Sequence, residues 1–269
     1  MATTTSKRST KTTTTKKNTK NTAIRFQSKT LDITTHAVDC LVLPVGNDLK
    51  QSSDFSKVDA ASAFQLSQLV KQENFEPKPG KSLLLLGEFG IKAKRILLLG
   101  TGASTVNDLR QAFGKIHDAL KSLPIASITV SLENSPAASI DKQARILAEC
   151  TVSIEHRPDH LKSKPATTPY SPNTITLSIS KADAADAEKG LAVGQAIGSG
   201  VNLARLLGDL PANICTPSYL AEQALGLAAK NKKLSVDVLD EKQMKALGMG
   251  SLLSVAAGSE QPAKLIVFE

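Results

Sequence analysis

Aromatic residues are scarce in this sequence: they make up 3% of its 269 residues, and tryptophan is absent. Proteins that hold single-stranded nucleic acid usually stack the bases on aromatic side chains, so this class is not indicated. The hydrophobic fraction is 41%, which is ordinary for a globular protein. We therefore expect a core built from aliphatic side chains.

Long apolar runs and paired cysteines are also missing. The apolar stretches are far shorter than the roughly 20 residues that cross a bilayer. The N-terminus lacks the apolar region of a signal peptide. Cys40, Cys150 and Cys215 lie far apart and form no Cys-x-x-Cys pair, which indicates a reducing compartment. These observations predict a cytoplasmic protein that does not contact a membrane.

Positive charge is unevenly distributed along the chain. The formal net charge is +8, but six basic residues and no acid lie within residues 1–20. The remainder is close to neutral, so a nucleic-acid surface along the whole chain is not indicated. Residues 1–22 are mostly Thr, Lys, Ser and Asn, and we predict a disordered basic tail. Weak contact with DNA or a membrane surface is its alternative function.

From Ile24 onward, short apolar runs alternate with segments of helical spacing. The spacing predicts helices over 109–120 and 140–148, with Ser139 placed to cap the second. The alternation predicts an α/β domain over 23–170, with a mostly parallel sheet and helices on both faces. The runs typical of buried strands are 39–45, 82–86, 95–99, 125–132 and 174–179.

A second region follows a polar, proline-containing loop at 156–170. We predict a linker helix over 181–208 that packs between domains, because Gly190, Gly194 and Gly198 share one face and permit close backbone approach. Residues 209–269 contain patterns for two helices and two strands. A unit of this size is only marginally stable alone, so we expect an incomplete second domain.

Local signals mark the helix ends within residues 209–269. Thr216 followed by Pro217 is a strong helix start. Asp240 and Gln243 have the spacing of a capping box, and Gly248 follows as a stop signal. Strands are predicted over 234–238 and 264–268.

One glycine-rich segment invites comparison with dinucleotide-binding loops. Gly100-Thr101-Gly102 follows a predicted strand, but Thr105 occupies the position of the next glycine in the fingerprint. A tight turn is therefore favoured, and an anion or nucleotide contact through backbone amides is the alternative.

Histidines and a lysine are the remaining candidates for chemistry. His156 and His160 are four residues apart, but Pro158 indicates a loop, so a metal pair is only an alternative. His36 and His117 are isolated, and Lys264 begins a predicted strand. No cysteine lies in a nucleophile motif, and no Walker, nucleophile-elbow or zinc-peptidase motif occurs. Residue chemistry alone predicts no catalytic, cofactor-binding or metal-binding residue.

Several motifs do occur in a fixed order after residue 198. They are Asn-x-Ala-Arg, Pro-x-Asn-x-x-Thr-Pro, Leu-Gly-Met-Gly and Gly-Ser-x-x-Pro, each followed at the expected distance by the next. In this order they resemble the leucyl (cytosol) aminopeptidase family, in its bacterial form. The stretches DCLVLPVGNDL and RILLLGTG resemble the family's macro-like amino-terminal domain. The matching residues are Asn202, Ala204, Arg205, Pro211, Asn213, Thr216, Pro217, Gly248, Met249, Gly250, Gly258, Ser259 and Pro262.

The resemblance implies a peptidase that removes N-terminal residues, often Leu, from peptides during intracellular protein turnover. Two divalent metal ions, Mn or Zn, would activate a bridging water in such an enzyme. The resemblance also implies assembly as a homo-hexamer, with DNA binding in some bacterial members. The family's first metal-binding segment would begin shortly after Glu269. We therefore expect a chain that stops before these ligands, binds no metal and is inactive alone.

The alternative to a peptidase is a binding protein. In this interpretation a macro-like module contacts DNA or a nucleotide, with help from the basic tail. It depends on the charge of residues 1–22 and on the segment around Gly100.

Overall fold

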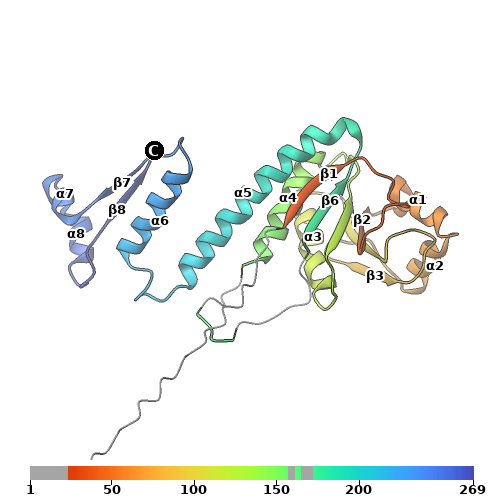
Figure 1. The fold of residues 1–269 in the computed structure, drawn as a ribbon, viewed down its shortest axis with the longest axis horizontal. Coiled ribbons are helices and arrows are strands. Elements are labelled where there is room, and N and C mark those ends of the chain that lie inside the picture. Colours follow the sequence, from red (N-terminus) through yellow and green to blue (C-terminus); the bar gives the residue numbers. More distant parts are fainter. Residues whose placement is uncertain (1–23, 157–160, 165–171) are drawn as a thin grey trace, which may run out of the picture.

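The structure is a computed structural model, and it describes residues 24–156, 161–164 and 172–269 (Figure 1). The predicted tail at 1–22 lies outside these ranges. A six-stranded sheet dominates the first part, in the order β1-β6-β5-β2-β4-β3. Its strands are β1 (Arg25–Lys29), β2 (Cys40–Gly46), β3 (Ser82–Leu86), β4 (Arg95–Gly102), β5 (Ser127–Ser131) and β6 (Thr174–Ser178).

Parallel pairing prevails within this sheet, as predicted. Only β3 runs antiparallel, and it pairs with β4 at one margin. The central strands are apolar because both of their faces are covered. On β2, for example, Leu41 and Leu43 belong to one buried cluster, while Cys40 and Val42 belong to the other.

Helices form a layer on each face of the sheet (Figure 1). The cluster on one face includes residues of α1 (Ser53–Ala61) and α2 (Gln65–Gln72). The cluster on the other face includes residues of α3 (Val106–Leu120), α4 (Ile140–Ile154) and α5 (Ala184–Asp209). Two short 3-10 helices, η1 (Leu49–Gln51) and η2 (Lys181–Asp183), join these elements.

The sheet extends beyond residue 170, where the sequence placed the end of the first domain. Strand β6 lies between β1 and β5 and pairs with both, so residues up to Ser178 belong to the sheet. Strand β1 was not predicted, because its sequence, RFQSK, is largely polar. This composition suits a strand that has a neighbour on only one side.

The long helix α5 packs closely against α4. A Cβ atom on Gly190 would lie 2.2 Å from the carbonyl oxygen of Asp141, and one on Gly194 would lie 2.2 Å from that of Arg145. The predicted close approach is therefore present. Its partner on this face is α4, a helix of the first domain. The outer face of α5 leaves Val193 and Ile197 exposed.

A smaller unit follows α5 and lies beyond its C-terminal end, away from the large sheet (Figure 1). Its two strands pair antiparallel, with Val238 opposite Ile266. The predicted helix starts at Thr216 and Asp240 are confirmed, since each side chain accepts a hydrogen bond from a backbone amide of its helix. Its elements are α6 (Pro217–Lys230), β7 (Val236–Leu239), α7 (Glu241–Ala246), α8 (Gly250–Ala256) and β8 (Leu265–Phe268).

Apolar side chains remain exposed on this smaller unit. Val255 is 84% exposed and Leu247 is 62% exposed, and the same holds to a lesser degree for Leu252 and Phe268. The buried hydrophobic residues of this unit are Ala221, Ala224 and Met244. Among the described helices, none is both long enough and apolar enough to cross a membrane.

Candidate functional site

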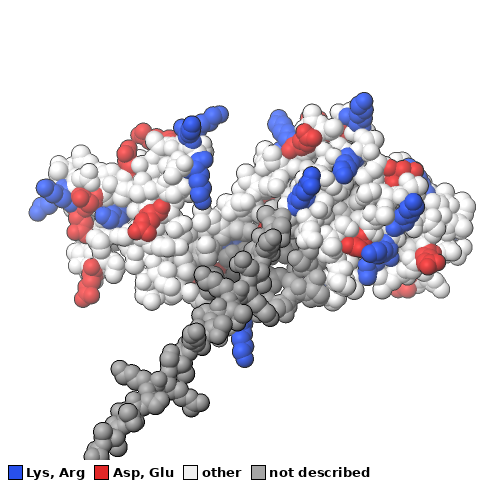
Figure 2. Space-filling view, viewed as in Figure 1, with Lys and Arg blue, Asp and Glu red and all other residues white. Residues whose placement is uncertain are grey.

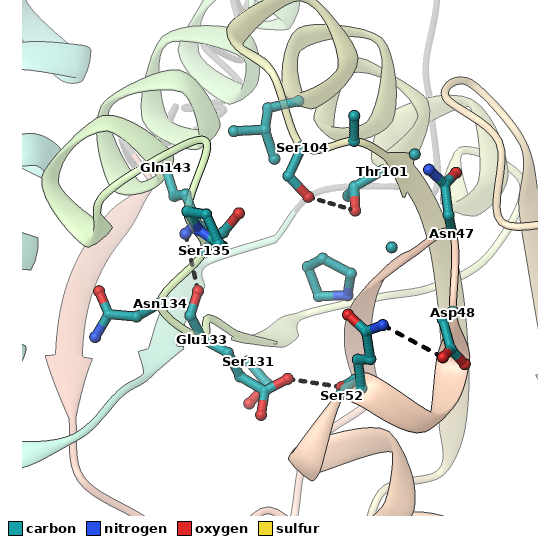
Figure 3. A pocket seen from close by; sticks show the side chains of 17 residues that line it. Asn47, Asp48, Ser52, Thr101, Ser104, Ser131, Glu133, Asn134, Ser135 and Gln143 are labelled. Carbon is teal, nitrogen blue, oxygen red and sulfur yellow. Dashed lines mark hydrogen bonds between the residues drawn. The ribbon is translucent and has the colours of Figure 1, made fainter.

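A polar cavity of about 410 Å³ opens at the carboxyl ends of β2, β4 and β5 (Figure 3). The chain after β2 leads to α1 on one face of the sheet, whereas the chain after β4 leads to α3 on the other. Such a reversal leaves a crevice where ligands commonly bind in open α/β sheets. Its walls are the segments 46–52, 101–104 and 131–136, together with Gln143 of α4.

Glu133 is the most heavily bonded residue of this cavity. Its carboxylate accepts hydrogen bonds from the Ser52 hydroxyl at 2.7 Å, from the Ser53 amide at 2.9 Å and from the Asp54 amide at 3.1 Å. The Ser53 hydroxyl also donates to it. The amides belong to the first turn of α1, where a negative charge is favourable. Glu133 therefore anchors the start of α1 to the end of β5.

Other polar side chains that line the cavity also form hydrogen bonds within its walls. The Gln143 amide donates to the carbonyls of Glu133 and Ala138, each at 2.9 Å. The Ser104 hydroxyl donates to that of Thr101 at 3.0 Å (Figure 3). These bonds hold the walls of the cavity in place.

The charge of the cavity is negative. Asp48 and Glu133 line it, and its lining includes no Lys, Arg or His. Asp54 is a further carboxyl near Glu133. Burial is the main cause that raises the pKa of the Asp54 carboxyl, and the charge of Glu133 raises it further. The hydrogen bond that Ser131 donates to Asp54 acts in the opposite direction. An acidic cavity does not favour a phosphate, so it gives no support to the nucleotide alternative.

Gly100 and Gly102 lie within β4, and Gly102 also enters the predicted tight turn toward α3, which the Ser104 amide closes by donating to the Thr101 carbonyl at 2.7 Å. A Cβ atom on Gly100 would lie 2.3 Å from the carbonyl oxygen of Lys78, so a neighbouring backbone segment requires this glycine. Gly102 has a φ of +53°, a conformation that favours glycine. Packing therefore accounts for these two glycines without a ligand.

Of the two histidines in the alternative metal pair, His156 and His160, the structure describes His156. Nε2 of His156 lies 2.7 Å from Oδ2 of Asp209, which connects the end of α4 to the end of α5. His160 and Asp159 lie outside the described residues. Among residues 24–156, 161–164 and 172–269, no group of three or more His, Cys, Asp and Glu is placed to hold a metal ion.

Cys40 and Cys150 show no sign of nucleophilic activation. Burial raises the pKa of the Cys40 thiol to about 12 and that of Cys150 to about 11. Both thiols therefore stay protonated at neutral pH, whereas a nucleophilic cysteine requires the thiolate.

The motif residues after residue 198 shape and join the helices. The Asn202 side-chain amide donates to the Val152 carbonyl at 2.7 Å, and Arg205 donates to the Ser153 carbonyl at 2.8 Å. Both carbonyls belong to the last turn of α4, where carbonyls lack α-helical partners further along the chain, and the Val152 carbonyl also accepts a hydrogen bond from the Glu155 amide at 3.0 Å. Further along, Gly248 has a φ of +74° and separates α7 from α8.

Two sequence profiles of one family match the chain in succession. The profile described as "Cytosol aminopeptidase family, N-terminal domain" matches residues 42–165, and that described as "Cytosol aminopeptidase family, catalytic domain" matches residues 202–269. The chain belongs to the cytosol aminopeptidase family. The first match covers the large sheet from β2 to β5, and the second begins at Asn202 of α5.

Individual relatives support this assignment. A probable cytosol aminopeptidase of Nitrosococcus oceani is 39% identical over 235 residues, which cover 85% of this chain and 47% of the relative. The cytosol aminopeptidase of Pseudomonas aeruginosa is 37% identical over 251 residues, which cover 91% of this chain and 50% of the relative. The chain thus spans about half the length of the curated relatives that it matches.

Solved structures agree with the fold. A mutant of tomato leucine aminopeptidase matches with a TM-score of 0.75 and 25% identity, covering 91% of this chain and 50% of that one. A bottromycin maturation enzyme in complex with Mn matches with a TM-score of 0.65 and 20% identity, covering 86% of this chain and 44% of that one. The second likeness concerns the fold alone.

Proposed function

We propose that this chain is the amino-terminal part of a metal-dependent aminopeptidase that releases N-terminal residues, preferentially leucine, from peptides in the cytoplasm. The observation that carries the proposal is the succession of the two family profiles, in the order N-terminal domain and then catalytic domain. The names of the relatives give the activity and the compartment that we extend to this chain.

In this proposal the large sheet forms a supporting domain, and α5 joins it to the first units of the catalytic domain. The domain boundaries that we propose are 24–178 for the supporting domain and 209–269 for the catalytic part. The bonds from Asn202 and Arg205 to the end of α4 support a fixed connection between α4 and α5. The macro-like character of the supporting domain and a homo-hexameric assembly remain predictions of the family resemblance.

The family chemistry calls for two divalent metal ions, Mn or Zn. The described residues do not fit such a centre, because no cluster of His, Cys, Asp or Glu in them has the required arrangement. We therefore derive no step of peptide hydrolysis from this chain. We propose that the metal site depends on the further length that the relatives possess, and that this chain alone is inactive.

Hydrolysis of leucine p-nitroanilide by the purified chain tests the proposed inactivity. The assay would include Mn²⁺ or Zn²⁺, with the Pseudomonas aeruginosa enzyme in parallel as the positive control. We expect release of p-nitroaniline at the rate of the blank, together with no Mn²⁺ binding in calorimetry. Metal-dependent hydrolysis of the substrate that co-purifies with the chain through successive purification steps would overturn the proposal.

The alternative function, a DNA- or nucleotide-binding module, has weaker support. Its tail lies outside the described residues, and the cavity beside Gly102 is acidic. The profiles and relatives point to peptidases.

A further inference from the structure

We propose that the free edge of β3 pairs with β3 of a second copy of this chain, antiparallel and about a two-fold axis. The two six-stranded sheets would then form one continuous sheet across the dimer. This surface belongs to the supporting domain, and neither the cavity nor the family motifs include it. The proposal does not rest on peptidase activity.

The first argument is the direction of the backbone groups of β3. The Gly100 amide donates to the Lys81 carbonyl at 2.9 Å, so Lys81 turns its polar groups toward β4. These directions alternate along a strand. The backbone N–H and C=O groups of Leu83 and Leu85 therefore also point toward β4, whereas those of Ser82, Leu84 and Leu86 point away from it. Within the described residues, no other strand lies beyond β3 to accept or donate these bonds.

The second argument is that nothing on β3 protects this edge. Its sequence is SLLLL, with no charge and no proline, and its register with β4 is unbroken. Natural proteins usually shield an open edge with charged residues, proline or a bulge. The opposite margin of the sheet follows that rule, because β1 carries Arg25 and Lys29 at its ends. Leu86 is 64% exposed at the open margin, although it is a large apolar side chain.

The third argument is self-complementarity. In antiparallel pairing, residues directly opposite each other either both turn their polar groups toward the partner strand or both turn them away from it. A two-fold axis at Leu84 satisfies this condition, since it places Leu84 opposite the partner's Leu84 and Ser82 opposite the partner's Leu86. Leu84 and Leu86 of the two strands would then lie on the same face of the joined sheet, as directly opposite or diagonal neighbours. Such cross-strand apolar contacts stabilise a sheet.

Charge complementarity supports the same arrangement. Lys81 precedes β3 and Glu88 follows it, and both are exposed. Neither forms a salt bridge among the described residues. An antiparallel pair brings the Lys81 end of one strand to the Glu88 end of the other, twice by symmetry. A parallel partner would instead bring like charges together.

Sedimentation velocity of the whole chain, over a range of concentrations, measures the association. We expect a dimer of twice the 28.4 kDa chain, whose dissociation constant rises at least about tenfold with Leu86→Lys. Leu225→Lys, a matched exposed leucine on α6, should leave association unchanged. A chain that stays monomeric up to about 100 μM, well above the micromolar range of weak complexes, would overturn the proposal.

A charge exchange tests the orientation without touching the apolar strand. Lys81→Glu and Glu88→Lys should each weaken the dimer, because each places like charges at both ends of the pair. The double variant should restore association to the original level. Amide hydrogen exchange should show slower exchange at Leu84 and Leu86 in the dimer than in the dilute monomer. A dimer whose dissociation constant is unchanged by these substitutions, or is raised only by Leu225→Lys, would have its interface elsewhere and would contradict the proposal.

Discussion

The side-chain amide of Asn202 donates a hydrogen bond to the carbonyl oxygen of Val152, across a distance of 2.7 Å. Asn202 begins the segment that matches the catalytic-domain profile, whereas Val152 lies in the last turns of α4 within the supporting domain. This bond, together with the one from Arg205 to the Ser153 carbonyl, therefore joins the two matched regions. Asn202, which the sequence offers only as a family motif residue, here holds one helix against another.

Replacement of Asn202 should destabilise the supporting domain. Asn202→Ala leaves the Val152 carbonyl without its side-chain donor, and a bond of this kind contributes about 1 kcal/mol to the free energy of unfolding. Urea denaturation followed by circular dichroism measures this change. Ser199→Ala, at an exposed position of the same helix, serves as the control and should have an effect below about 0.5 kcal/mol. Equal effects of the two substitutions would contradict the assigned role of Asn202.

The contact between α4 and α5 should not tolerate a methyl group at Gly194. Gly194→Ala would place Cβ 2.2 Å from the Arg145 carbonyl oxygen and 2.8 Å from Cβ of Ala148, so the helices must separate. Overpacking of this kind costs about 1–3 kcal/mol. Gly200→Ala provides the matched control, because no atom lies within 4 Å of its Cβ position. The control should raise stability by about 0.5–1 kcal/mol, since alanine favours the helix. Thermal unfolding that ranks the two variants the other way would refute this packing.

Much of the fold could be predicted from the sequence, and the omissions have physical causes. Central strands such as β2 and β4 are uninterrupted apolar runs because helices cover both of their faces. Strand β1 lies at a margin and needs fewer apolar residues, so its sequence carries no such signal. Helix α1 was missed for a related reason: its core contacts come from only a few residues, such as Phe55 and Val58.

Stability should depend on the ionisation of Asp39. Burial alone would raise the pKa of this carboxyl, but hydrogen bonds from Lys94, Ala126 and Ser127 outweigh burial and lower it to about 2. The folded pKa thus lies below the ordinary value of 3.8. The stabilisation is complete above that value and is lost as pH falls from about 4 toward about 2.

Asp39→Asn should therefore be less stable than the original chain at pH 7, because a neutral amide accepts these bonds less well. The difference should shrink steadily below pH 4. Urea unfolding at a series of pH values would show this convergence. A difference that stays constant down to about pH 2 would mean that ionisation of Asp39 does not contribute.

Thiol accessibility should separate the three cysteines. Cys40 is fully buried, and burial raises the pKa values of Cys40 and Cys150 to about 12 and about 11. Since the thiolate is the reactive form, we expect both to react slowly with Ellman's reagent in the native protein. Cys150 and Cys215 are both partly buried, but the raised pKa of Cys150 slows its reaction, so Cys215 should react first. Rapid reaction of all three thiols without denaturant would contradict this order.

The candidate site was less predictable than the fold. The residues that line the cavity lie far apart in the sequence, so no local motif predicts it. Glu133 follows β5 without a recognisable pattern, and only the pairing of β5 with β2 brings it to the start of α1. The motifs after residue 198 carry a family signal, but their contacts with α4 required the folded chain.

The most direct test of the proposed function is a fusion protein. It would consist of this chain followed by the part of the Pseudomonas aeruginosa cytosol aminopeptidase that lies beyond the matched half. We expect the fusion to hydrolyse leucine p-nitroanilide with Mn²⁺, because this chain would supply the supporting domain and the first catalytic units. The same bacterial segment alone should not do so. A fusion that folds and binds Mn²⁺ but shows no turnover would contradict the assignment of this chain to a functional aminopeptidase.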